Sequence, residues 1–83
     1  MRRKKTAREI ADLIERFLTG TSLYPQEWND FVECSERDRK LDAYRKRCYD
    51  LDPLVNIPGP PDAAAIAELK SIVAELRRLE ESN

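Results

Sequence analysis

The fold is decided by residues 62–80, which read DAAAIAELKSIVAELRRLE. Alanine has the highest helix propensity, and alanines dominate the opening of this segment. The apolar side chains then recur at steps of four and three, which places them on one helix face: Ala65, Leu69, Ile72, Leu76 and Leu79. Asp62 at the start and the arginines near the end suit the helix dipole. These features predict a helix over 62–80 that must bury its apolar face against other helices.

Residues 52–61, immediately before this helix, contain four prolines and a glycine. Proline removes a backbone donor and restricts the preceding residue, so we expect this segment to be non-helical. The apolar residues Leu54, Val55 and Ile57 favour an ordered crossover that packs on the helices. The alternative is that the same loop exposes an apolar site for a partner.

The first helix has a readable start and end. Thr6 and Glu9 have the spacing of a capping box, and Gly20 can supply the left-handed residue that closes a helix. Apolar residues at three-and-four spacing between them form one face: Ile10, Leu13, Ile14, Phe17 and Leu18. The sequence therefore predicts a helix over 7–19.

A second helix is predicted over 25–34. Pro25 suits the first helical position, because its missing N–H would have no partner there. Leu23 and Trp28 have the spacing of a hydrophobic staple across this helix start.

A further capping signal begins at Ser35, and apolar residues follow at helical spacing: Leu41, Tyr44, Cys48 and Leu51. We therefore predict a third helix over 36–51. An unbroken helix over 25–51 is the alternative, because no residue between Ser35 and Arg39 forbids it.

No stretch alternates strictly between apolar and polar residues, so no strand is predicted. The expected fold is all-α, a compact antiparallel bundle of four helices in a single domain over 6–83. Residues 1–5 are expected to form a basic, disordered tail. The predicted core comprises Ile10, Leu13, Ile14, Phe17, Trp28, Phe31, Val32, Leu41, Tyr44, Cys48, Leu69, Ile72, Val73 and Leu76.

Composition argues against several functions. The chain has 83 residues, a net charge of −1 and no histidine, so it lacks the usual general base and the commonest metal ligand. No apolar run is long enough for a membrane helix, and no hydrophobic stretch of the signal-peptide type follows the basic start. Enzyme motifs and a glycine-rich phosphate loop are absent from the sequence. We expect a cytoplasmic, non-enzymatic protein with no cofactor, no metal and no membrane partner.

The two cysteines, Cys34 and Cys48, are predicted to be free thiols in a reducing compartment. On one helix they would lie about 21 Å apart, and a disulfide requires Cα atoms within about 7 Å. Two thiols without histidine also make a poor zinc site.

An acidic surface is the leading candidate for a binding site. Residues 9–36 hold one arginine against seven acids, which could steer a basic partner protein. The candidate residues are Asp12, Glu15, Glu27, Asp30 and Glu33, with Tyr49 as an exposed aromatic anchor. The alternative for these acids is a solvated outer face with no partner.

The basic run over 37–47 favours a different partner. Four of its residues could neutralise phosphates of RNA or DNA in a small regulator: Arg39, Lys40, Lys46 and Arg47. Asp38 and Asp42 interrupt this run, so a protein partner is preferred. Self-association through residues 62–80 is a further alternative, which leaves monomer and homodimer open.

The sequence Ile14-Glu15-Arg16-Phe17-Leu18-Thr19-Gly20, followed by Trp28-Asn29-Asp30-Phe31, resembles small uncharacterised bacterial helical proteins. It is also similar to the helical immunity proteins of colicin-like toxins, and the resemblance covers residues 10–32. It implies a bacterial, non-enzymatic inhibitor that covers a toxin nuclease with acidic groups. The five acidic candidates are assigned to this role by their charge in this sequence.

Overall fold

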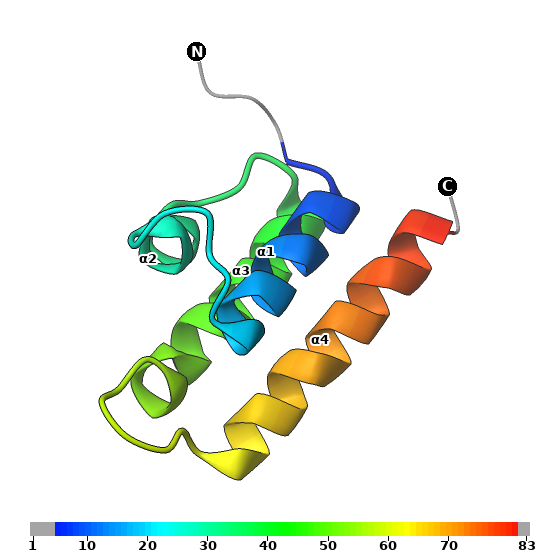
Figure 1. Cartoon of the computed structure of the whole chain (residues 1–83). Helices are drawn as coiled ribbons and strands as arrows, with labels where there is room; N and C mark the ends of the chain where they lie inside the picture. The colour runs from blue at the N-terminus through cyan, green and yellow to red at the C-terminus, as the bar shows by residue number, and fades with distance from the viewer. Residues whose placement is uncertain (1–4, 82–83) are drawn as a thin grey trace.

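The computed structural model describes residues 5–81, which form four α-helices and no strand (Figure 1). The helices are α1 (Ala7–Thr19), α2 (Glu27–Glu33), α3 (Arg39–Val55) and α4 (Ala63–Glu81). Helix α4 runs antiparallel to α1 and α3 and packs on both, and short α2 lies across the bundle on the side away from α4. The predicted all-α, four-helix fold is confirmed. None of the helices in residues 5–81 combines the length and apolar character needed to span a bilayer.

Helix α1 has the predicted bounds and the predicted caps. The Thr6 hydroxyl accepts a hydrogen bond from the Glu9 backbone N–H at 3.1 Å, and the Glu9 carboxylate accepts one from the Thr6 N–H at 3.0 Å. Gly20 adopts a left-handed conformation with φ of 71°, and its N–H donates to carbonyls of the last turn. Local signals alone therefore fix this helix.

Helix α2 begins later than predicted. It starts at Glu27, so Pro25 lies in the preceding turn and does not occupy the first helical position. The predicted staple is also wrong, because the Leu23 side chain is 73% exposed. Trp28 instead stacks on Phe17 of α1, with ring centroids 4.1 Å apart. Stacking inside the core buries the large indole more completely than a contact at the helix entrance would.

The chain breaks between α2 and α3, so the alternative of one unbroken helix over 25–51 is wrong. The cap is Asp38 and not Ser35, because the Asp38 carboxylate accepts hydrogen bonds from the N–H groups of Lys40 and Leu41. An aspartate is among the best N-caps, and the helix therefore starts at Arg39 and not at residue 36.

Helix α3 continues through Pro53 to Val55, which corrects the prediction that residues 52–61 are all non-helical. Two tertiary contacts hold this last turn. The Trp28 indole N–H donates to the Asp52 carboxylate at 2.6 Å, and the Val55 side chain is buried in the core. These contacts outweigh the local preference of proline. Leu54 and Ile57, by contrast, are exposed, so the expected packing of the crossover holds only for Val55.

Replacing Pro53 with alanine is expected to raise the free energy of unfolding by about 0.5–1 kcal/mol. Pro53 is exposed, so no packing is lost, and alanine would restore a backbone donor in the last turn of α3. The gain is partly offset by the greater freedom of the unfolded chain. Urea denaturation followed by circular dichroism measures the change, and a loss of stability would show that the proline ring makes a favourable contact.

The core lies where α4 crosses α1 and α3 and where α2 covers their other side. Most of the predicted core residues are buried, and Phe17, Tyr44 and Val73 are half-buried against them. The prediction missed Ala7, Ala11, Val55 and Ala65. Three of these are alanines, which carry a weak hydrophobic signal but allow helices to approach closely.

Candidate protein-binding site

Asp12 and Glu15, two of the predicted binding acids, bind an arginine of the chain itself. Arg77 of α4 donates to the Asp12 carboxylate at 2.9 Å and to the Glu15 carboxylate at 3.1 Å. The hydrogen bonds that Arg77 donates, first to Glu15 and then to Asp12, raise the pKa of Arg77 above its ordinary value. These acids therefore tie α1 to α4.

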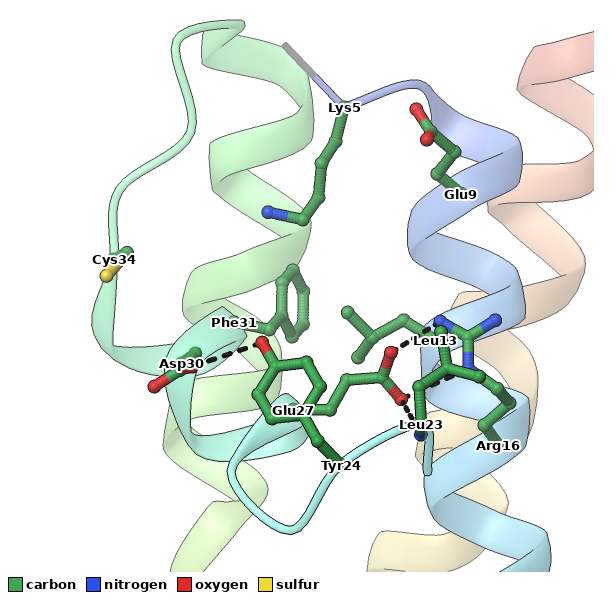
Figure 2. Close-up of a pocket in the computed structure, with 10 residues that line it drawn as sticks. All are labelled: Lys5, Glu9, Leu13, Arg16, Leu23, Tyr24, Glu27, Asp30, Phe31 and Cys34. Carbon is green, nitrogen blue, oxygen red and sulfur yellow. Dashed lines mark hydrogen bonds and ion pairs between the residues drawn. The ribbon is translucent and has the colours of Figure 1, made fainter. Parts of the chain in front are cut away.

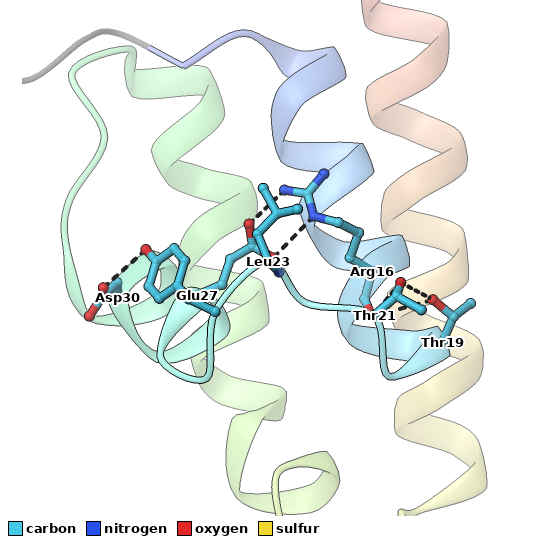
Figure 3. Close-up of polar contacts among 7 residues, drawn as sticks. Arg16, Thr19, Thr21, Leu23, Glu27 and Asp30 are labelled. Atoms are coloured by element: carbon cyan, nitrogen blue, oxygen red, sulfur yellow. Dashed lines mark hydrogen bonds and ion pairs between the residues drawn. The ribbon is translucent and has the colours of Figure 1, made fainter.

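Glu27 is not a surface acid but a buried one, with 5% of its surface exposed. Its carboxylate accepts two hydrogen bonds from the Arg16 guanidinium, at 3.1 and 2.7 Å, and one from the Leu23 N–H at 3.1 Å (Figure 3). The Arg16 hydrogen bonds lower the pKa of Glu27, even though burial acts in the opposite direction. Glu27 holds α2 and its entry loop against α1, so it is unavailable to a partner.

One of the four predicted nucleic-acid residues, Arg47, is paired within the fold. Arg47 faces α4, where it donates to Glu68 at 2.5 Å and to Glu75 at 3.2 Å, and these carboxylates raise its pKa. Arg39, Lys40 and Lys46 remain exposed. The Lys46 ammonium lies 3.9 Å from the Asp42 carboxylate. One of the four predicted phosphate-binding groups is therefore already neutralised inside the fold.

A ring of arginines links each helix to the next. Arg16 joins α1 to α2, and the buried Arg45 joins α3 to α2 through the Val32 carbonyl at 2.9 Å. Arg47 joins α3 to α4, and Arg77 closes the ring from α4 to α1. The partners lie from 11 to 65 residues apart in the sequence. No local pattern could have paired them, which is why structural acids were predicted as binding acids.

Asp30 and Glu33 are the two predicted binding acids that form no ion pair within residues 5–81. The Asp30 carboxylate accepts a hydrogen bond from the Tyr24 hydroxyl at 3.1 Å, and the Glu33 side chain is exposed. Within residues 5–81, no lysine or arginine forms an ion pair with either carboxylate. Glu33 also ends α2, where the helix dipole disfavours a negative charge. These two carboxylates are therefore exposed and form no ion pair within residues 5–81.

A groove of about 670 Å³ runs between α1 and α2 beside these acids (Figure 2). Leu13 and Phe31 point toward each other at its floor, and Leu23, Tyr24 and Asp30 line its mouth. Leu23 was predicted to pack on Trp28 in a hydrophobic staple, and this groove was not predicted. The proline after Tyr24 was the available signal, since it delays the start of α2 and leaves Leu23 on a projecting loop.

Tyr49, the predicted aromatic anchor, is 55% exposed. It follows Arg45 by one helical turn and precedes Asp52 by another, and both of these residues contact α2. Tyr49 therefore lies on the flank of α3 nearest to α2, outside the groove. The predicted basic tail over 1–5 lies outside the described residues except for Lys5, whose ammonium is 3.6 Å from the Glu36 carboxylate.

The two cysteines are free and differ in environment. Cys48 is fully buried, and this burial raises the pKa of its thiol to about 12. Cys34 is half-buried at the edge of the groove.

In the folded protein we expect a thiol reagent such as Ellman's reagent to modify one cysteine, Cys34, within minutes at pH 8. The thiolate is the reactive form, and Cys48 holds almost none at that pH. Absorbance should report a second equivalent only after urea unfolds the chain. Cys34→Ser should abolish the fast phase, and rapid modification of Cys48 in that variant would contradict the buried environment.

Among residues 5–81, no group of three or more cysteine, aspartate or glutamate side chains is arranged to hold a metal ion. Comparisons with protein-family models, with curated proteins and with solved structures found no match to this chain.

Proposed function

We propose that this chain is a non-enzymatic protein-binding module that presents the outer face of α2 to a basic partner protein. One observation carries the proposal. Of the five candidate acids, Asp12, Glu15 and Glu27 are paired with arginines of the chain itself, whereas Asp30 and Glu33 form no ion pair with a cation of residues 5–81. Asp30 accepts a hydrogen bond from the exposed Tyr24, and the exposed Leu23 precedes Tyr24 on the loop before α2.

Charge and exposed apolar area serve different steps of such binding. Unpaired carboxylates attract and orient a cationic surface, which raises the association rate more than the final affinity. Large exposed apolar and aromatic side chains then supply contact area that excludes water. A surface that combines both is typical of a protein partner, whereas a nucleic-acid partner would require a cationic one.

The most specific form of the proposal is a toxin-neutralising role of the immunity type, as the resemblance over residues 10–32 implies. Acidic groups of α2 would then cover a basic surface of a toxin. In this form the protein inhibits by occupying a site and carries out no reaction.

The competing partner is a nucleic acid bound by Arg39, Lys40 and Lys46, which remain exposed. Binding of this kind would weaken steeply between low and physiological salt. Homodimerisation through α4 is less well supported, because the predicted stripe of α4 is buried within the chain at Ala65, Leu69, Ile72 and Leu76.

The test is affinity capture from the source cell with the full chain, in three forms. The wild type is compared with Asp30→Lys/Glu33→Lys and with a control of equal charge change, Glu80→Lys/Glu81→Lys, which lies at the exposed end of α4. A protein retained by the wild type and the control, but reduced at least tenfold by the α2 variant, supports the proposal. Capture of nucleic acid alone, or of proteins equally retained by all three forms, contradicts it.

A further inference from the structure

We infer that the groove between α1 and α2 is the docking site for a short basic, amphipathic segment of the partner protein. An apolar side chain of that segment would rest between Leu23 and Tyr24, and an arginine or lysine beside it would meet Asp30. This inference rests on the proposed function and names the site and the chemistry of its ligand.

The apolar part of the argument comes from exposure. Leu23 is 73% exposed and Tyr24 is 47% exposed, and they are neighbours on the loop that forms the mouth of the groove. Phe31 at the floor is almost fully buried. Because Phe31 offers little surface, the contact area comes from the two projecting side chains, which can hold an aliphatic or aromatic side chain between them.

The charged part of the argument comes from which ionised groove residues already form an ion pair or a hydrogen bond. Glu27 is neutralised by Arg16, and the Lys5 ammonium is 3.6 Å from Glu36. The Glu9 carboxylate caps α1 through the Thr6 N–H. The Asp30 carboxylate accepts a hydrogen bond from the Tyr24 hydroxyl at 3.1 Å and forms no ion pair with a cation of residues 5–81. Asp30 and the nearby Glu33 give this wall a net negative charge, and its complement is a cationic side chain.

The hydrogen bond between Tyr24 and Asp30 explains how the site stays satisfied when it is empty. A hydroxyl supplies one neutral donor to the carboxylate, and a guanidinium or ammonium forms a stronger, charge-assisted contact. Binding would therefore exchange the Tyr24 donor for the cation at the Asp30 carboxylate. The volume of about 670 Å³ is sufficient for several side chains and favours a peptide segment over one residue.

The test uses random 12-residue peptides displayed on phage and selected on the immobilised full chain. We expect the enriched sequences to pair arginine or lysine with a large apolar residue. One such labelled peptide is then titrated by fluorescence anisotropy. Leu23→Ser and Asp30→Asn should each weaken binding about tenfold. The matched controls are Leu54→Ser and Asp50→Asn, which change an exposed leucine and an exposed aspartate elsewhere and should leave binding unchanged.

All four substitutions are at exposed positions, so the fold is expected to persist, and circular dichroism verifies this. Backbone amide shifts on titration should be largest over residues 23–34. Selected peptides without a basic residue, no enriched peptide, or equal effects of the groove and control variants would overturn the inference. If Asp30→Lys/Glu33→Lys reduces the retention of a captured protein but Leu23→Ser does not, the docking site is wrong while the proposed function stands. If neither variant reduces the retention of any captured protein, the proposed function itself fails.

Discussion

Trp28→Ala is expected to lower the free energy of unfolding by about 3–5 kcal/mol, which is a large part of the stability of a domain of this size. Trp28 lies on α2 and links this helix to α1 and α3. Its ring stacks on Phe17 of α1, lies 6.0 Å from the ring of Phe31 in α2, and donates its indole N–H to Asp52 of α3 at 2.6 Å. Alanine would remove all of these contacts and leave a cavity between the helices.

The matched variant Trp28→Phe separates packing from hydrogen bonding. Phenylalanine keeps an aromatic ring but leaves the Asp52 carboxylate without its donor, so we expect a smaller loss of about 1–2 kcal/mol. Urea denaturation followed by far-UV circular dichroism is the suitable measurement, because both variants lack the only tryptophan. A loss below about 1 kcal/mol for Trp28→Ala would show that α2 is not held through this residue.

The last turn of α3 depends on the same contact. Residues 52–55 were predicted to be non-helical from Pro53, and the prediction failed because the hydrogen bond to Asp52 and the burial of Val55 are tertiary effects. Helix α1, in contrast, was predicted with its bounds, because Thr6, Glu9 and Gly20 determine its ends through neighbouring residues. Sequence reasoning was accurate where the causes are local.

The candidate site was predicted less well for the same reason. A carboxylate on a helix surface has the same sequence signature whether it faces solvent or an arginine of a distant helix. Asp12 and Glu15 differ from Asp30 only because α4 places Arg77 beside them, across more than 60 residues of chain. The pairing of charges, which determines the acids that remain available for a partner, follows from the folded topology.

Glu27→Gln is expected to lower the free energy of unfolding by about 2 kcal/mol at pH 7, because glutamine has the same shape but lacks the charge that binds Arg16. Glu27 is buried, and the remaining Arg16 guanidinium would lie against a neutral amide. The matched control is Asp30→Asn on the same helix, which removes an exposed charge and should change stability by less than about 0.5 kcal/mol.

The dependence on pH provides a second, independent measurement of the same contact. The Arg16 hydrogen bonds hold the pKa of Glu27 below its ordinary value in the folded state. Protons therefore bind more tightly to the unfolded chain, and the contribution of Glu27 is complete above the unfolded pKa and is lost as the pH falls through the folded one. The difference in stability between the wild type and Glu27→Gln should accordingly be largest near neutral pH and shrink below about pH 4. A difference that stayed constant down to about pH 2.5 would mean that the carboxylate contributes through its shape and not through its charge.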